Sequence, residues 1–172
     1  LSLPAGLLPP WSAGLAPTDA DLSFRVSGFD LAAPATLLIG AFDLEKPNLI
    51  DPAMGEFLLS ALLPKGTVEV TLLPGRVASG LYELQFQGSM TAGEMVPPTG
   101  SAWIALRGME QVLAALSAAP AEVKDEAVLA LLLIKGLANA EADDNFVWRI
   151  DSPVSGQVLI NGFDVTELFG GR

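Results

Sequence analysis

The chain of 172 residues contains no cysteine and no histidine. Without cysteine it can form neither a disulfide nor a thiolate nucleophile, and without histidine it lacks the imidazole of most catalytic triads and of the usual zinc ligand sets. It also contains no Gly-x-Ser-x-Gly elbow, no Walker-type phosphate loop and no Gly-x-Gly-x-x-Gly segment. We therefore expect a protein that is not an enzyme and has no cofactor or metal. An enzyme that uses carboxylates alone stays open as the catalytic alternative.

Positive charge is scarce in this chain. Nine Lys and Arg residues stand against 20 Asp and Glu, which leaves a net charge of -11 at pH 7. Binding to nucleic acid or to an anionic lipid surface depends on cationic side chains, so we expect neither partner. Hydrophobic residues make up 51% of the chain and charged residues only 17%, which excludes a disordered chain and allows a sizeable core.

Long apolar runs are missing as well. The longest uninterrupted run covers residues 127–134, far short of the ~20 residues that span a bilayer, so we expect no transmembrane segment. The first residues lack the basic region of a signal peptide and are interrupted by Pro4, Pro9 and Pro10. Because Leu1 is not methionine, we expect a processed protein or an excised fragment, and the sequence leaves open whether a signal or anchor has been removed.

Apolar and polar residues alternate in four segments of the chain. Leu22, Phe24 and Val26 show the pattern, and it recurs over residues 67–73, 81–87 and 145–151. Alternation with a period of two is typical of an antiparallel sheet that has one buried and one wetter face. A doubly wound parallel sheet would instead show continuous apolar strands.

The order of the expected elements repeats once. Residues 17–30 and 98–110 both begin with Pro-Thr, run through a strand and reach a glycine followed by an acid. Each is followed by two expected helices and two strands around a small turn. The sequence predicts an α+β fold: an antiparallel curved β-sheet with helices packed on one face, from two β-α-α-β-β units. The expected division is a Pro-rich N-terminal segment (1–16), a first unit (17–90), a linker (91–97) and a second unit (98–172), preferably in one continuous domain.

The last expected helix is unusually apolar. Over residues 120–138 its central turns are apolar on nearly every side. We expect such a helix to be deeply buried or to cover another apolar surface.

Matching the glycines of the two units brings apolar residues into register. When the sequence around Gly28 is aligned with that around Gly108, Phe24 corresponds to Ile104 and Val26 corresponds to Leu106. Trp148 falls on the apolar side of its strand. The candidates for contact with an apolar ligand or a partner are Phe24, Val26, Trp103, Ile104, Leu106 and Trp148.

Trp103 falls on the opposite, wetter face of its strand. An aromatic there can line a ligand groove or a partner surface. It can equally lie under the N-terminal segment that contains Trp11, and we favour this packing interpretation.

The acidic residues near the turns suggest structural roles. Asp19 and Asp21, like the Asp143–Asp144 pair, lack the oxygen-rich spacing of a calcium loop and are interpreted as solvated turn acids. Three further acids each come shortly after a glycine, which favours capping of a following helix over a catalytic pair. These are Asp30, Glu110 and Asp164.

Two stretches resemble a known family. They are GEMVPPTGSAWIALRGMEQVLAAL (93–116) and VWRIDSPVSGQVLINGFDV (147–165). They resemble the C-terminal part of a family of uncharacterised exported proteins of Gram-negative bacteria, classed as a domain of unknown function. That family is loosely similar to AsmA-like envelope proteins.

The resemblance implies a periplasmic location and a link to lipid handling at the cell envelope. Together with the apolar composition it predicts a non-enzymatic envelope module that binds, or scaffolds around, a lipid or another apolar ligand. The alternative is a protein-interaction or structural module without a small ligand. The expected partners are a lipid or apolar molecule, an envelope protein or a second copy in a homodimer.

Overall fold

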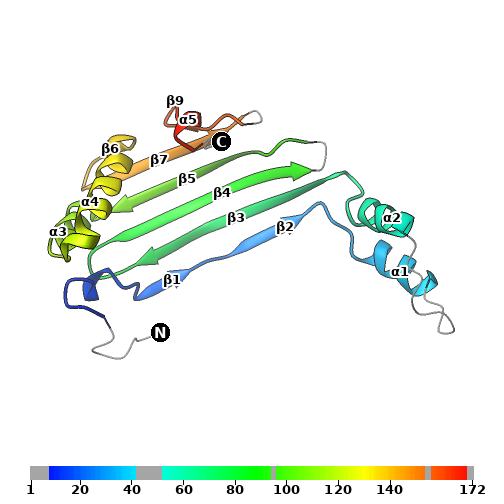
Figure 1. Cartoon of the computed structure of the whole chain (residues 1–172), viewed down its shortest axis with the longest axis horizontal. Coiled ribbons are helices and arrows are strands. Elements are labelled where there is room, and N and C mark those ends of the chain that lie inside the picture. The colour runs from blue at the N-terminus through cyan, green and yellow to red at the C-terminus, as the bar shows by residue number, and fades with distance from the viewer. Residues whose placement is uncertain (1–7, 42–51, 94–95, 154–155, 170–172) are drawn as a thin grey trace.

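The computed structural model describes residues 8–41, 52–93, 96–153 and 156–169. This part of the chain forms one sheet of nine strands with helices at both of its ends (Figure 1). The strands are β1 (Asp19–Asp21), β2 (Phe24–Ser27), β3 (Thr67–Ala78), β4 (Glu83–Gly93), β5 (Thr99–Arg107), β6 (Asn139–Glu141), β7 (Asn145–Ser152), β8 (Leu159–Ile160) and β9 (Phe163–Asp164). The helices are η1 (Ala13–Leu15), α1 (Ala32–Ala41), α2 (Pro52–Leu62), α3 (Met109–Ser117), α4 (Ala121–Gly136) and α5 (Thr166–Phe169).

Every strand pair in the sheet is antiparallel. Short β1 and β2 both pair with β3 at one edge, and the order continues through β4, β5, β7, β8 and β9, with β6 also pairing with β7. The long central strands curve together into an arch (Figure 1). The expected α+β class and the antiparallel curved sheet are confirmed, and both halves of the sequence contribute strands to the one sheet.

Two central strands are longer than the alternation predicts. β3 continues through Pro74, where the sequence suggests a turn, because one extra residue between Leu72 and Gly75 makes a bulge. Proline is tolerated there because its missing N–H falls at the bulge, beside the break between β1 and β2. β4 extends to Gly93, so the first residues of the expected 91–97 linker are strand. The turn to β4 follows Ala78. There the Ser79 hydroxyl accepts hydrogen bonds from the backbone amides of Leu81 and Tyr82.

The register separates an apolar from a polar face of the sheet. One row of directly opposed residues, from β2 to β7, is Phe24, Leu72, Gly88, Ala102 and Ile150. The neighbouring row, whose side chains point to the other face, is Arg25, Thr71, Ser89, Ser101 and Asp151. The alternation in the sequence therefore corresponds to two real faces, which we call the apolar face and the polar face.

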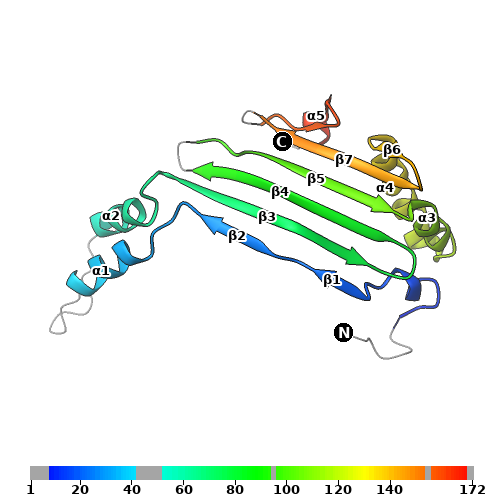
Figure 2. The ribbon, with the colours of Figure 1, turned by 180° about the vertical axis from the view of Figure 1, so that it is seen from behind.

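The core lies where α3 and α4 cover the apolar face. Met109 of α3 is fully buried and packs with Trp148 of β7 and with Ile160 and Val165 from the C-terminal segment. The indole Nε1 of Trp148 donates a hydrogen bond of 2.8 Å to the carbonyl of Ile134, which ties β7 to α4. In the reverse view the strands lie in front of α4, and no described helix covers the polar face (Figure 2).

The two helix pairs do not share one location. α3 and α4 sit over one end of the sheet, whereas α1 and α2 extend beyond the opposite end (Figure 1). Helices packed on one face are therefore found for α3 and α4 only. α4 is not deeply buried: its inner side reaches the core through Leu131, but Leu129 and Leu133 are exposed. Within the described residues, no helix combines the length and the apolar content needed to cross a membrane.

The three acids expected to cap helices behave differently. Asp30 caps α1, since its Oδ1 accepts a hydrogen bond of 2.8 Å from the Ala32 amide. Asp164 does the same for α5 through the Thr166 amide at 2.9 Å. The expectation is wrong for Glu110, because Gly108 is the residue before α3 and Glu110 lies within the first turn, where it pairs with Lys135.

The cap at Asp164 makes a prediction about pH. The hydroxyl and amide of Thr166, together with the Gln157 side chain, hydrogen-bond its carboxylate and lower the pKa of Asp164 below 3.8. A lowered folded-state pKa contributes stability that is present above the unfolded pKa and lost as the pH falls through the folded pKa. A carboxyl NMR titration should therefore find a lower pKa for Asp164 than for an unperturbed aspartate, and Thr166→Val should raise the pKa of Asp164. An unchanged pKa in that variant would contradict the assignment.

Candidate apolar ligand site

Large apolar side chains remain exposed on the uncovered part of the apolar face. Phe24 is 68% exposed, Met90 is 49% exposed and Val26 is 37% exposed. Val26 and Met90 both lie opposite Val70 of β3, so these side chains share one stretch of the face. Exposed apolar residues that gather in one place indicate a binding surface, whereas scattered ones do not.

The floor beside these side chains is built from small residues. Gly88 and Ala102 oppose each other on β4 and β5, and Gly100 opposes Met90. A Cβ at Gly100 would lie 2.4 Å from the backbone oxygen of Ser89, so the strands approach too closely for a larger residue. The apolar face is therefore recessed at Gly88, Gly100 and Ala102, between the bulkier residues of β2 and β3 on one side and of β7 on the other.

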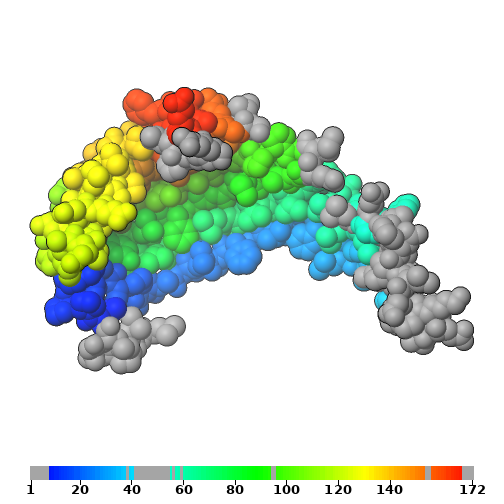
Figure 3. Space-filling model, viewed as in Figure 1, coloured from blue at the N-terminus to red at the C-terminus, as the bar shows by residue number. Residues whose placement is uncertain are grey.

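A hollow lies over this floor. It has a volume of about 200 Å³ and is lined by Met90, Pro98, Gly100, Ala102 and Ile150, with Ser152 and the backbone of the adjoining residues. The space-filling view shows the face recessed between α4 at one end and the segment of α1 and α2 at the other (Figure 3). Because its lining is almost entirely hydrocarbon, this recess can accept an apolar chain but offers little to a polar one.

The structure divides the sequence-predicted site residues among three environments. Phe24 and Val26 lie on the open part of the apolar face. Ile104, Leu106 and Trp148 are on the same face, but α3 and α4 cover them and they belong to the core. Trp103 lies on the polar face. The six candidates therefore do not form one site, because a helix pair covers only one end of a long sheet.

Sequence reasoning missed the floor of the site. Gly88, Met90 and Gly100 stand in a Gly- and Pro-rich stretch typical of a linker, and they became site residues only because β4 and β5 extend into it. The one available signal was the apolar Met90 two residues after Gly88, which continues the alternation of the preceding strand.

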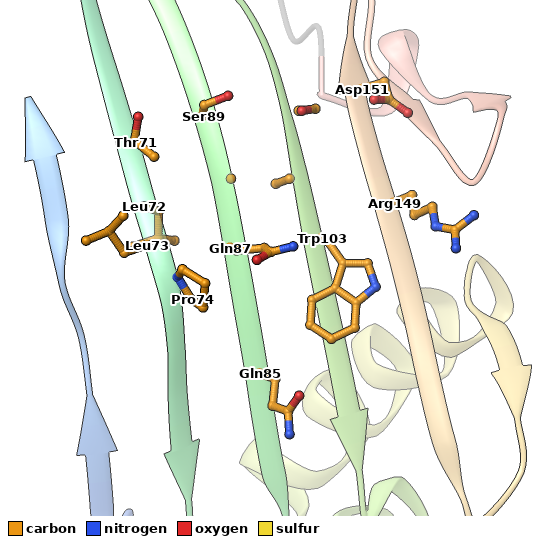
Figure 4. Close-up of a pocket in the computed structure, with 13 residues that line it drawn as sticks. Thr71, Leu72, Leu73, Pro74, Gln85, Gln87, Ser89, Trp103, Arg149 and Asp151 are labelled. Carbon is orange, nitrogen blue, oxygen red and sulfur yellow. The ribbon is translucent and has the colours of Figure 1, made fainter. Parts of the chain in front are cut away.

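The polar face contains the remaining candidate. Trp103 is directly opposite Gln87 on one side and Arg149 on the other. It lines a hollow of about 740 Å³ whose other walls combine polar side chains with Leu73 and Pro74 of β3 (Figure 4). The described N-terminal residues lie elsewhere, with Gly14 against Leu81, and none of them lines this hollow.

Among the described residues, the acids near the turns are exposed or half-buried. Asp19 pairs with Arg76, and the acids of the turn at Asp143 and Asp144 adopt positive φ angles of 61° and 55°. Among the residues that the structure describes, no group of three or more acids could hold a metal ion. Comparison with protein-family models, with curated proteins and with solved structures finds no match to this chain.

Proposed function

We propose that this protein is a non-enzymatic module that binds a lipid or another apolar chain on its apolar face. The observation that carries the proposal is the continuity of exposed Phe24, Val26 and Met90 with the hydrocarbon-lined hollow on the same face. These large side chains are exposed to water, although their burial would be favourable.

An acyl chain fits the physical requirements of the recess. Each methylene removed from water contributes about 0.8 kcal/mol, so a partly covered chain of ordinary length can be held without any charged contact. The small floor residues let such a chain lie close to the backbone, while Phe24 and Ile150 stand on either side of it in the same row. The open side of the recess allows entry and release of a ligand without unfolding.

The proposed setting is the periplasm of a Gram-negative cell envelope. Its support is the resemblance of residues 93–116 and 147–165 to the exported envelope family, together with the apolar recess. A module of this kind would hold the apolar part of an envelope lipid, or scaffold proteins that do.

We also propose that the two halves are β-α-α-β-β units. The support is the shared element order, which is β2, α1, α2, β3 and β4 in one half and β5, α3, α4, β7 and β8 in the other, with β6 as an addition. The matched Gly28 and Gly108 both precede a helix and have φ angles of 92° and 87°.

We propose that the two halves share the order of their elements, and not that one half is a superimposable copy of the other. β2 and β5 run in opposite directions, yet each has its following partner strand on the same side, and Phe24 and Ile104 point to the same face. A half-turn about an axis perpendicular to the sheet keeps each side chain on its face and reverses the strand direction. The same half-turn also moves the partner strand to the other side. The two arrangements therefore have opposite hands and cannot be superimposed as they stand.

The ligand-binding proposal is tested with two neighbouring substitutions. Phe24→Asn removes an aromatic group from the apolar face, and Arg25→Asn changes the adjacent residue on the polar face. Because burying a phenylalanine is worth about 1.5–3 kcal/mol, we expect Phe24→Asn to weaken binding about tenfold or more. The measurement is a titration with the fluorescent fatty acid cis-parinaric acid, and Arg25→Asn should behave as the unmodified protein.

A second variant tests the floor of the recess directly. Ala102→Phe places a ring where the acyl chain would lie and should abolish uptake while circular dichroism stays unchanged. Native mass spectrometry of the protein purified from cells should show an added lipid mass that solvent extraction removes. If the protein takes up no cis-parinaric acid and carries no such mass, the ligand proposal is wrong.

A protein-interaction module is the second candidate function. Its specific support is the edge of the sheet at β1 and β2, where Leu22 is 64% exposed beside Phe24. An unpaired strand edge with apolar side chains is a template for pairing with another chain. This function predicts a bare mass of two copies in native mass spectrometry, shifted toward one copy by Phe24→Asn.

A further inference from the structure

The polar face has one large aromatic among polar neighbours. Trp103 lies between Gln87 and Arg149, its directly opposed residues on β4 and β7. Figure 4 shows its indole lying over the strands with the ring face turned outward, between these two side chains. The other side chains that line the hollow are polar on β4, β5 and β7, namely Gln85, Ser89, Ser101 and Asp151, and on β3 they are Thr71 with the apolar Leu73 and Pro74.

Packing within the described chain does not explain this tryptophan. It is partly exposed, whereas Trp148 on the neighbouring strand is buried in the core. The described part of the N-terminal segment contacts Leu81 and α3 instead of Trp103. An indole held open on a wet face offers a flat apolar surface with polar groups at its rim.

Two hollows meet at this residue. The larger, of about 740 Å³, extends toward Arg149 and Asp151, and the second, of about 480 Å³, extends toward Arg76 and Asp19. Both are lined by Trp103 together with Gln85 and Gln87. They form a continuous open groove along the face, which suits an extended ligand better than a compact one.

The charge of the groove favours an uncharged ligand. In the larger hollow the charged side chains are Arg149 and Asp151, which cancel. In the second, Arg76 is paired with Asp19, and Asp21 adds one negative charge, which leaves no free cation there for an anionic ligand. With a net charge of -11 on the whole chain, an anionic polymer would be repelled. The hydrogen-bonding groups beside the indole are planar amides and hydroxyls, which can donate and accept without carrying charge.

We propose that the polar face binds a neutral polysaccharide, with Trp103 as the stacking platform. One face of a pyranose ring consists of C–H groups that pack on an aromatic ring, while its equatorial hydroxyls reach the rim. Gln87 and Arg149 are placed to hydrogen-bond those hydroxyls on the two sides of the indole, and Gln85 lies along the groove toward the neighbouring sugar. Among the described residues, the side chains of Gln87 and Arg149 make no hydrogen bond or ion pair that would compete.

The polysaccharide site is independent of the apolar ligand site. Trp103 and Phe24 lie on opposite faces of the sheet, and the sheet itself separates the two hollows. Loss of one binding activity should leave the other intact, so failure of either proposal can be recognised separately.

The test is an NMR titration that follows the indole N–H signals of the isotope-labelled protein. The probes are the neutral hexasaccharides cellohexaose, chitohexaose and maltohexaose, each raised to millimolar concentration. We expect at least one to shift the Trp103 signal and to leave that of Trp148 in place. Trp103→Ala should weaken this binding about tenfold or more, Trp103→Tyr should retain part of it, and Phe24→Asn should leave it unchanged.

Three outcomes would overturn the proposal. One is that none of the three hexasaccharides shifts the Trp103 signal. Another is binding that survives unchanged in a Trp103→Ala variant whose circular dichroism shows a folded protein. A change from two copies to one in Trp103→Ala would assign this face to a protein interface and would also overturn it.

Discussion

Trp148→Ala is expected to lower the free energy of unfolding by about 3–5 kcal/mol, the usual cost of truncating a buried tryptophan. Trp148 is 6% exposed and fills the space between β7 and the α3–α4 pair, against Met109 and Ile160. Its indole also satisfies the carbonyl of Ile134 near the end of α4. Truncation would leave a cavity between α4 and β7 and would remove the hydrogen bond that ties the indole to α4, although the Ile134 carbonyl would keep its bond from the Leu137 amide.

The measurement is thermal unfolding followed by circular dichroism. For a domain of this size the loss corresponds to a fall in Tm on the order of 10 °C. Trp103→Ala is the matched control, since it removes the same side chain from the neighbouring strand on the polar face, and it should lower Tm much less. Equal losses in the two variants would mean that the core does not lie under α3 and α4.

Asn161→Ala is expected to destabilise the protein by about 2–4 kcal/mol, because three hydrogen bonds of a partly buried amide are lost together. The Asn161 amide nitrogen donates to the carbonyls of Leu137 at 2.8 Å and Val147 at 2.9 Å. Its oxygen accepts from the backbone amide of Arg149 at 2.9 Å. One side chain thus joins the end of α4, the strand β7 and the turn between β8 and β9.

The control for this substitution is Asn139→Ala in β6, an exposed asparagine of the same region. Urea unfolding should show a reduced midpoint with an unchanged slope for Asn161→Ala and little change for the control. Asn161→Asp should also be destabilising, because a carboxylate cannot donate to the two carbonyls. If Asn161→Asp is as stable as the unmodified protein, these hydrogen bonds contribute nothing.

Local patterns predicted the strands well wherever each strand has a dry side and a wet side. Phe24, Leu84, Phe86 and Trp148 do point to one face, because successive side chains of a strand must alternate. The helix over residues 121–136 was also predicted within a few residues, since its apolar periodicity and the proline before it act locally.

Local patterns did not predict the structure where one residue type can occupy two kinds of backbone position. Gly93 falls in the expected linker and Gly88 and Gly100 stand in the Gly- and Pro-rich stretch around it, yet in the structure these three glycines allow β3, β4 and β5 to approach closely. Pro74 was interpreted as a turn, yet it occupies a bulge. Glycine and proline mark both chain reversals and irregular positions within strands, and only the partner strand distinguishes the two.

The candidate ligand residues show the same limit. Matching Gly28 with Gly108 placed Phe24 beside Ile104 as equivalent apolar positions, and both do lie on the apolar face. Their surroundings differ because α3 and α4 cover Ile104, while Phe24 lies at the open edge of the sheet. An apolar residue in a strand shows which face it occupies, but not whether another element covers that face.

The sequence by itself determined the α+β class, the antiparallel sheet, the division into two faces and the place of Trp103 on the wetter one. These properties depend on composition and on the period of neighbouring residues along the chain. Only the tertiary structure decided the length of β4, the position of the two helix pairs and which part of the apolar face stays open. Those depend on contacts between residues far apart in the chain, such as the hydrogen bond from Trp148 to Ile134 and the glycine approach between β4 and β5, which no local pattern encodes.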